Sequence, residues 1–259
     1  MRASTDAREI ALVTGGGQGI GAAISRRLGD DGYHVVVNDL DEGRAKSIVS
    51  EIDEAGGSAS SAVADVSSSE SVERMFIQVE GEIGPVDALV NNAGIGGNAA
   101  IRDVDDAFWD RVLSVDLNGV FFCSRRALGA MRERRKGSIV NVASRAWLGW
   151  WGQSAYASAK AGVVGLSRAL AVEMASRNVR VNVVAPGLID TPLLHDRDDE
   201  ALARLITSVP IGRTGQPIDV AGAVSFLISP RSRTITGQVL YVCGGKSVYA
   251  YPDWQGQRP

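Results

Sequence analysis

Two side chains that could carry acid–base chemistry stand four residues apart, Tyr156 and Lys160. In a helix this spacing places both on one face, about one turn apart. A phenol with an ordinary pKa of about 10 is a poor acid–base catalyst at neutral pH, but a nearby ammonium favours the phenolate and lowers that pKa. Ser144 ends an apolar run upstream, and a strand-to-helix crossing could return it to Tyr156 to hold a substrate oxygen. The three residues predict proton transfer at an oxygen atom, although a Tyr–Lys pair alone is also typical of an ordinary solvated helix face.

A glycine-rich stretch at residues 14–21 directly follows a short apolar run. Gly15, Gly19 and Gly21 suit a tight turn whose backbone approaches a pyrophosphate, with the N–H groups of the next helix directed at the negative charge. Asp39 comes twenty residues after Gly19, where a carboxylate accepts adenosine ribose hydroxyls and repels a 2'-phosphate. Because no Lys or Arg stands beside Asp39 in the sequence, we expect NAD rather than NADP as the cofactor.

The composition excludes several classes of protein. With 259 residues, 45% of them hydrophobic and 22% charged, the chain can bury a full hydrophobic core without disulfides or a structural metal. A net charge of -3 argues against a nucleic-acid partner. Two cysteines (Cys123, Cys243) and two histidines (His34, His195) are scattered without the spacing of a metal site. No apolar run reaches about 18 residues, and no signal peptide is evident, so we expect a cytoplasmic protein without a membrane partner.

Apolar runs and helical patterns alternate along the chain. Strands are predicted at residues 10–14, 35–38, 61–64, 86–90, 138–142, 180–184 and 239–242. Helices are predicted from the glycine-rich loop to about residue 31 and over residues 41–55, 69–83 (with Ser69 as N-cap), 105–134, 154–177 and 221–228. Continuous apolar strands that alternate with helices are typical of a parallel sheet covered on both faces. We therefore predict an α/β fold, a single-domain Rossmann-type doubly wound parallel sheet of about seven strands with helices on both faces.

The domain organisation follows from the same pattern. Residues 1–8 are expected to be a flexible N-terminal extension, and residues 9–245 the dinucleotide-binding domain. Residues 190–215 interrupt the alternation with prolines, glycines and a charged run, so we interpret them as a substrate lid. Residues 246–259 form a C-terminal tail with several aromatic side chains.

Taken together, these motifs resemble those of the short-chain dehydrogenases/reductases. They occur in the family's order and spacing over residues 9–245, as residues 14–21, Asn91-Asn92-Ala93-Gly94, Asn118-Gly119, Ser144, Tyr156-Ala-Ser-Ala-Lys160 and Pro186-Gly187 with Thr191. The resemblance implies an NAD-dependent oxidoreductase that acts on CH–OH groups. One departure is that Cys243 stands where the family often has Asp in a Val-Asp-Gly-Gly ending.

The resemblance also implies a catalytic set of four residues. Tyr156 would exchange a proton with the substrate oxygen, and Ser144 would hold that oxygen by a hydrogen bond. Lys160 would lower the pKa of Tyr156 and bind the nicotinamide ribose. Asn118 would anchor a water that passes protons from Lys160 to solvent; its other interpretation is a helix-bending side-chain to backbone bond.

The cofactor residues implied by the resemblance lie in the glycine-rich loop and at the carboxyl ends of the strands. They are Gly15, Gly17, Gln18, Gly19, Ile20, Gly21, Asp39, Leu40, Asp65, Val66, Asn92, Ala93, Gly94, Tyr156, Lys160, Pro186, Gly187, Ile189 and Thr191. For Asp65 the alternative is simple capping of the loop before the next helix.

Three tryptophans lie between Ser144 and Tyr156, in a segment that the family places beside the substrate, opposite residues 95–98 and 188–194. They suggest a bulky apolar wall for an aromatic or alicyclic secondary alcohol or its ketone, or else they pack against the lid or a neighbouring subunit. The substrate residues expected on the first interpretation are Ser144, Trp147, Trp150, Trp151, Tyr156, Leu188 and Leu194. His195 could also touch substrate, although a solvated histidine explains it equally simply.

Assembly is a further implication of the resemblance. We expect a homotetramer, with a dimer as the alternative, joined through the long helix and the helix that carries Tyr156. Small residues on that helix, Ala157, Ala161, Gly165 and Ala169, would permit close approach of a second copy. The tail at residues 246–259 is expected at a subunit interface.

Two other functions stay open. The substrate could be a hydroxyacyl thioester, as for a 3-hydroxyacyl-CoA or 3-oxoacyl-carrier-protein enzyme, with the basic cluster at residues 132–136 as a docking patch. That cluster also suits the negative end of a helix dipole. A dinucleotide-binding protein without turnover is the remote alternative. Such a protein has no need of Tyr156 and Lys160, and this chain contains both.

Overall fold

One seven-stranded parallel sheet forms the centre of the computed structural model, which describes residues 8–195 and 199–248. The strand order is β3-β2-β1-β4-β5-β6-β7. The strands are β1 (Ile10–Thr14), β2 (His34–Asp39), β3 (Ala59–Val63), β4 (Ala88–Asn91), β5 (Gly137–Val142), β6 (Val179–Pro186) and β7 (Val239–Val242). The order reverses between β1 and β4, and such a switch point opens a crevice at the carboxyl ends of the strands. The predicted α/β fold with a single sheet is confirmed.

Side chains of each strand alternate between two cores. Ala11 and Val13 of β1 belong to one hydrophobic cluster, while Leu12 belongs to the cluster on the opposite face. All five residues of β1 are buried, because helices cover both faces. This is the reason that the central strands read as unbroken apolar runs rather than alternating ones.

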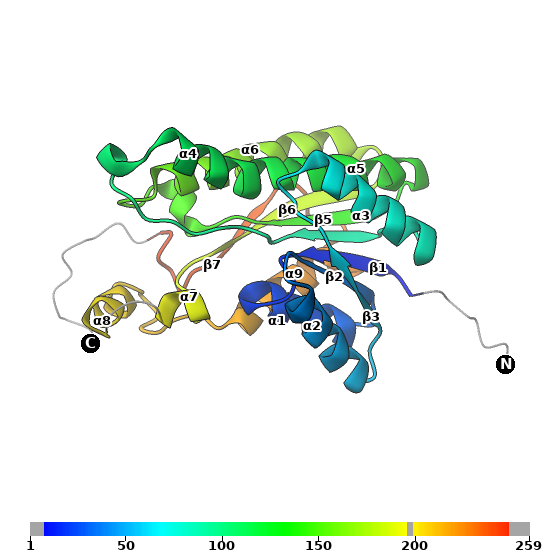
Figure 1. Cartoon of the computed structure of the whole chain (residues 1–259), viewed down its shortest axis with the longest axis horizontal. Coiled ribbons are helices and arrows are strands. Elements are labelled where there is room, and N and C mark those ends of the chain that lie inside the picture. Colours follow the sequence, from blue (N-terminus) through cyan, green and yellow to red (C-terminus); the bar gives the residue numbers. More distant parts are fainter. Residues whose placement is uncertain (1–7, 196–198, 249–259) are drawn as a thin grey trace.

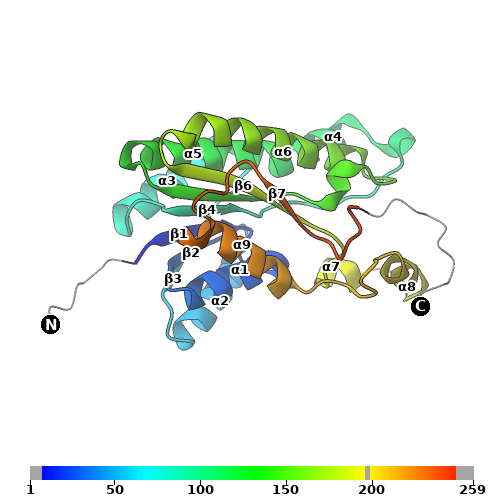
Figure 2. The ribbon, with the colours of Figure 1, turned by 180° about the vertical axis from the view of Figure 1, so that it is seen from behind.

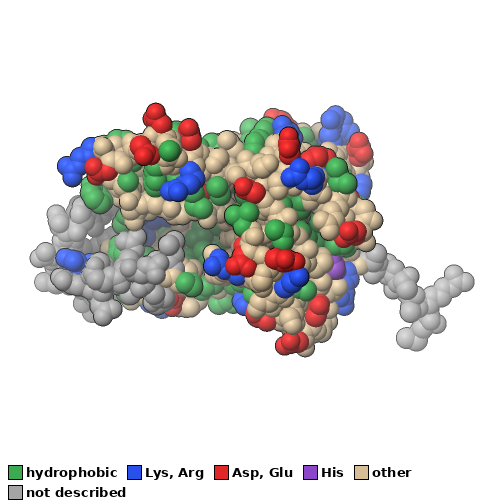
Figure 3. All heavy atoms as spheres, viewed as in Figure 1, with side chains coloured by type: hydrophobic (Ala, Val, Ile, Leu, Met, Phe, Trp, Pro, Cys, Tyr) green, Lys and Arg blue, Asp and Glu red, His purple; other side chains and the backbone are tan. Residues whose placement is uncertain are grey.

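Helices form a layer on each face of the sheet (Figures 1 and 2). One layer holds α1 (Gly19–Asp30), α2 (Glu42–Glu54) and α9 (Pro217–Ile228). The other holds α3 (Ser69–Glu82), α4 (Asp106–Leu113), α5 (Gly119–Arg134) and α6 (Ser154–Ala175). The short helices α7 (Pro192–His195) and α8 (Asp199–Thr207) project beyond the sheet, to the left in Figure 1, from the segment predicted as a lid. Figure 3 shows the same side hollowed between the layers, with Lys/Arg and Asp/Glu side chains interspersed on the surrounding surface.

Several predicted boundaries need correction. The single helix expected over residues 105–134 is interrupted at Ser114–Asn118 by a π-helical turn between α4 and α5. Ser68, not Ser69, caps α3, because its Oγ accepts a hydrogen bond from Ser71 N at 3.2 Å. Helix α9 begins at Pro217, four residues earlier than predicted.

Candidate active site

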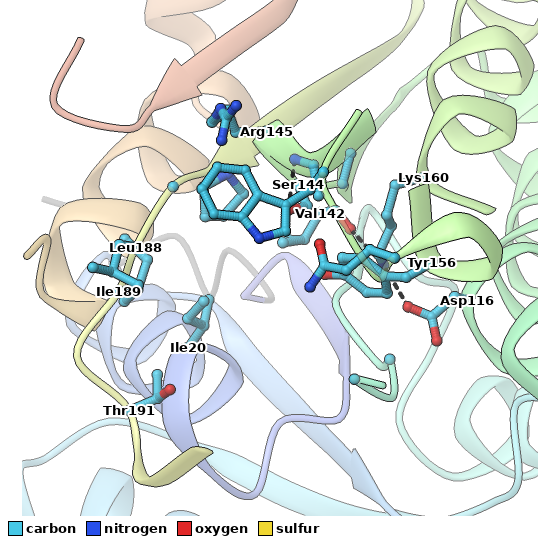
Figure 4. Close-up of a pocket in the computed structure, with 18 of the residues that line it drawn as sticks. Ile20, Asp116, Val142, Ser144, Arg145, Tyr156, Lys160, Leu188, Ile189 and Thr191 are labelled. Atoms are coloured by element: carbon cyan, nitrogen blue, oxygen red, sulfur yellow. Dashed lines mark hydrogen bonds and ion pairs between the residues drawn. The ribbon is translucent and has the colours of Figure 1, made fainter. Parts of the chain in front are cut away.

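A cavity of about 330 Å³ opens at the carboxyl ends of the central strands. This volume lies at the lower end of the range of about 300–1,000 Å³ that ligand pockets occupy. In Figure 4, Ser144, Tyr156 and Lys160 lie on one side of it, and Leu188, Ile189 and Thr191 lie on the other. The cavity therefore joins β5 and α6 to the segment that follows β6.

The glycine-rich loop has the shape of a phosphate cradle. A Cβ at Gly21 would lie only 1.9 Å from the carbonyl oxygen of Gly15, which itself has φ +59°. The loop is tied to the end of β4, because Asn92 Nδ2 donates to Gly15 O at 3.0 Å and Asn92 N donates to Thr14 Oγ1 at 3.0 Å. No side chain caps the start of α1, so its first N–H groups are available to an anion. These residues fit the pyrophosphate of a dinucleotide.

The carboxylate of Asp39, at the end of β2, contacts the same loop. Its Oδ2 accepts a hydrogen bond from Gly17 N at 3.0 Å, and its Oδ1 accepts one from Asp41 N at 3.1 Å. The sequence places no base beside Asp39, but the first turn of α2 brings Arg44 against the loop, since a Cβ at Gly17 would meet Arg44 Cβ at 2.8 Å. Arg44 Nε lies 3.4 Å from Asp41 Oδ2. A cation therefore does approach this end of the site, and the preference for NAD stays a prediction.

Tyr156 and Lys160 lie in the first turns of α6, as their spacing predicts. Lys160 Nζ lies 5.5 Å from the centroid of the Tyr156 ring and donates a hydrogen bond to Val142 O at 3.2 Å. Ser144 lies at the end of β5, where its Oγ accepts a hydrogen bond from Ala146 N at 3.1 Å. That bond leaves the Ser144 hydroxyl proton free to be donated into the cavity. The tertiary structure thus brings the three predicted residues to one cavity.

Asp116 is the partner of Lys160 that the sequence analysis missed. It lies in the π-helical turn with a fully buried side chain, and its Oδ2 is 3.0 Å from Lys160 Nζ. Its Oδ1 accepts a hydrogen bond from Ile95 N at 2.8 Å. Burial of the ammonium works to lower the pKa of Lys160, but attraction to Asp116 and Tyr156 outweighs it, and the pKa lies above its ordinary value. Lys160 is therefore an ammonium at neutral pH, with much of its charge balanced by Asp116.

Asn118 does not lie where its predicted role beside Lys160 requires it. Asn118 is exposed and does not line the cavity, whereas Asp116, two residues earlier, does. Residues two apart on a helical turn point in nearly opposite directions, so only one of them can face Lys160. A usable signal was present, because Asp116 is a charged residue between apolar Val115 and Leu117, and a buried carboxylate requires a partner.

Of the three tryptophans expected at the substrate wall, Trp150 alone lines the cavity. Trp147 packs against a core cluster that includes Val120 and Val164. Trp151 is 83% exposed. Two of the three rings thus lie outside the cavity, and packing against the lid or a neighbouring subunit stays a prediction for them.

The remaining predicted residues divide into two groups. Those that line the cavity, besides the residues described above, are Ile20, Gly94, Pro186, Gly187, Leu188, Ile189, Thr191 and Leu194. Those that lie outside it, along the loop and the ends of β1 to β4, are Gln18, Gly19, Leu40, Asp65, Val66 and Ala93. Asp65 Oδ1 accepts a hydrogen bond from Ser67 N at 2.8 Å, which agrees with its capping interpretation. Cavity residues that the sequence analysis missed are Asp116, Val142, Ala143, Arg145, Ala146, Gln153, Leu205 and Lys246.

Within residues 8–195 and 199–248, no three His, Cys, Asp or Glu side chains are grouped so that they could hold a metal ion. None of the helices in the same ranges combines the length and apolar character that a membrane span requires.

Comparison with known proteins gives consistent matches over most of the chain. Residues 15–247 match the short-chain family model described as Enoyl-(Acyl carrier protein) reductase. The BbsD subunit of a hydroxy(phenyl)methylsuccinyl-CoA dehydrogenase from Thauera aromatica is 43% identical over 241 residues, which cover 93% of this chain and 97% of that protein. The 3-oxoacyl-acyl-carrier-protein reductase FabG of Staphylococcus aureus is 38% identical over 237 residues, covering 91% of this chain and 96% of that protein.

A solved structure extends the comparison to three dimensions. A variant actinorhodin polyketide ketoreductase with NADPH superimposes with a TM-score of 0.90 at 39% identity, covering 93% of this chain and 98% of that one. The part of the chain that is similar to these proteins includes the sheet, the glycine-rich loop and the residues that line the cavity. The chain belongs to the short-chain dehydrogenase/reductase family, whose members are oxidoreductases that act on CH–OH groups and bind a nicotinamide dinucleotide.

Proposed function

We propose that this protein is an NAD(H)-dependent oxidoreductase that interconverts a hydrophobic secondary alcohol, aromatic or alicyclic, and its ketone. The observation that carries the proposal is that Ser144, Tyr156 and Lys160 meet at one cavity beside a glycine-rich phosphate cradle. Bound nicotinamide would supply or accept the hydride.

The side chains of the cavity would handle the proton. In reduction the Tyr156 hydroxyl gives its proton to the carbonyl oxygen, and in oxidation the phenolate takes the proton of the alcohol. The Ser144 hydroxyl, which already accepts from Ala146 N, donates to the same oxygen and fixes its position. Lys160, held by Asp116 and by Val142 O, keeps a positive charge beside the Tyr156 ring.

The preference for NAD is supported by the carboxylate of Asp39. Its hydrogen bond from Gly17 N holds it beside the loop, where a 2'-phosphate would meet a like charge. Two observations favour NADP instead: Arg44 also lies against the loop, and the ketoreductase compared above contains NADPH. Because Arg44 is paired with Asp41, we assign the larger effect to Asp39.

An apolar substrate is supported by apolar side chains in the lining of the cavity. Trp150, Ile95 and Leu188 line the cavity with apolar surface. A hydroxyacyl thioester is the second candidate, and it is favoured by the similarity to BbsD, whose name describes a phenyl group, a hydroxyl and a CoA thioester in one substrate. The similarity to FabG supports the same candidate for a carrier-protein thioester.

The test is NADH absorbance while the purified protein and NAD are mixed with cyclic and aryl secondary alcohols and hydroxyacyl-CoA substrates, with NADP in parallel. Tyr156→Phe should abolish turnover and leave NAD binding nearly intact, because only the acid–base hydroxyl is removed. A variant that retains the wild-type rate would remove Tyr156 from the mechanism. Turnover confined to thioesters would replace the leading proposal by the second.

We also propose that the protein forms a homotetramer, with a dimer as the alternative. Ala161, Gly165 and Ala169 form an exposed small-residue stripe on α6, and Val172 on the same helix is 80% exposed. Sedimentation equilibrium of the wild type and of Gly165→Lys tests this. A bulky charge on the stripe should dissociate a tetramer, and a monomeric wild type contradicts the proposal.

A further inference from the structure

Two cations line the cavity side by side, Arg145 and Lys246. The Arg145 guanidinium carbon lies 4.7 Å from the Trp150 ring centroid, and Lys246 Nζ lies 4.6 Å from the same ring. Lys246 Nζ donates a hydrogen bond to Ser208 Oγ. Arg145 Nε is buried and has no hydrogen-bond partner among the described residues. Within residues 8–195 and 199–248, neither cation forms an ion pair with a carboxylate.

Three other half-buried cations have oxygen partners. Arg126 pairs with Glu80 at 2.7 Å, and Arg134 pairs with Asp87 at 2.7 Å. Arg180 lacks a carboxylate but donates to the carbonyl oxygens of Leu227 and Ile228. The Arg145 guanidinium differs from these three cations, whose nitrogen atoms contact carboxylate or carbonyl oxygens.

The two charges also disfavour one another. Burial lowers the pKa of Lys246, and the neighbouring charge of Arg145 lowers it further. Burial likewise lowers the pKa of Arg145. Contact of both cations with the face of the Trp150 ring offsets part of this cost. An anion between them would remove the repulsion and satisfy Arg145 Nε.

We propose that Arg145, Trp150 and Lys246 form a subsite for an anionic group of the substrate, a carboxylate or a phosphate carried on the same molecule as the secondary alcohol. This inference rests on the proposed function, because it assigns the second end of the substrate whose hydroxyl faces Tyr156. The guanidinium fork of Arg145 matches the two oxygens of such a group, and Lys246 adds a point charge.

Position indicates that this subsite serves the substrate and not the cofactor. Arg145 directly follows Ser144, which holds the reacting oxygen. In Figure 4, Arg145 lies across the cavity from Ile20 and Thr191. Ile20 belongs to the first turn of α1, where the glycine-rich loop forms the phosphate cradle. The cofactor phosphates and the proposed subsite are therefore at different ends of the cavity.

The first experiment compares kcat/KM for 3-hydroxy-3-phenylpropanoate, its neutral methyl ester and its CoA thioester. We expect the wild type to prefer the acid or the thioester to the ester by about tenfold or more, as for hydrogen bonds to charged groups. Arg145→Gln should reduce that preference to near unity, and Lys246→Gln should reduce it in part. Arg231→Gln is the matched control, because Arg231 also lies over an aromatic ring, that of Phe226 at 6.0 Å, outside the cavity. A preference for the acid identifies a carboxylate, and a preference for the thioester identifies the CoA phosphates.

The second experiment measures binding without turnover. Isothermal titration calorimetry with 3-phenylpropanoate, neutral 3-phenylpropanamide and free CoA needs no reactive hydroxyl. We expect an anion to bind the wild type about tenfold or more tightly than the amide, and Arg145→Gln to lose that difference. If both anions bind no better than the amide, the subsite is overturned, even where neutral alcohols are oxidised. If an Arg145-dependent anion binds but no alcohol reacts, the proposed function fails and the subsite stands.

Discussion

Replacing Asp116 by Asn tests the buried pair on which Lys160 depends. The change keeps the size of the side chain and the hydrogen bond that Asp116 Oδ1 accepts from Ile95 N, but it removes the negative charge 3.0 Å from Lys160 Nζ. The lysine side chain is only 4% exposed, so water can replace the lost partner only in small part. The variant must therefore bury an unpaired ammonium or release its proton.

The expected cost can be bounded in two ways. Removal of one partner from a buried ion pair typically destabilises a protein by about 3–5 kcal/mol. Deprotonation of Lys160 sets a ceiling of about 4.6 kcal/mol at pH 7, for an ordinary lysine pKa of about 10.4. We therefore expect Asp116→Asn to lower the free energy of unfolding by about 3–4.6 kcal/mol at pH 7.

The dependence on pH provides a second readout. In the wild type the pKa of Lys160 is raised, so its contribution to stability is complete below the unfolded pKa and is lost only as pH rises through the folded one. In the variant, burial depresses the pKa of Lys160, and the folded state binds fewer protons than the unfolded state. The variant should therefore gain about 1.4 kcal/mol per pH unit relative to the wild type, once Lys160 is neutral and up to about pH 10.

Urea unfolding from pH 7 to about pH 10, at one protein concentration, measures both effects. Asn118→Ala is the matched control, because Asn118 is exposed on the same turn; we expect a change within about 0.5 kcal/mol and near-normal turnover. A difference below about 0.5 kcal/mol for Asp116→Asn at pH 7, or one independent of pH, would refute the assignment of the pair.

Three other perturbations follow from the geometry. Asp39→Ala removes the carboxylate beside Gly17 N and should weaken NAD binding and narrow its advantage over NADP; unchanged preference in titrations of both cofactors would place the discrimination elsewhere. Gly21→Ala sets a Cβ against Gly15 O and should weaken NAD at least tenfold by calorimetry, whereas Gly81→Ala, in open space on α3, should leave binding unchanged and stabilise the helix by about 0.5–1 kcal/mol. Trp150→Ala should raise KM for aryl alcohols about tenfold or more through lost apolar contact, and exposed Trp151→Ala should not; equal effects would contradict the assigned wall.

Much of the fold was predictable because its information is local. The predicted bounds of β1 and β7, residues 10–14 and 239–242, are those of the structure. Strands buried on both faces must be apolar at successive positions, so a short window of sequence identifies them. The same holds for Tyr156 and Lys160, whose separation within one helix sets their common face before any tertiary contact forms.

Other features of the site depended on packing between distant segments. The π-helical turn at Ser114–Asn118 decides that Asp116 and not Asn118 faces Lys160. The residue types around Asp116 indicated a buried carboxylate but did not identify its partner. Likewise, Trp147, Trp150 and Trp151 have equal apolar character, and only the path of their loop directs one ring into the cavity.

The sequence by itself therefore determined the sheet, the phosphate cradle and the order of the catalytic residues, because strand burial, turn geometry and helical spacing act over a few residues. Only the tertiary structure decided what surrounds them. Arg44 reaches the glycine-rich loop through the first turn of α2, and Arg145 meets Lys246 across about a hundred residues of chain, at one tryptophan ring. Charges and rings act through space, so their neighbours are known only once the distant segments have packed.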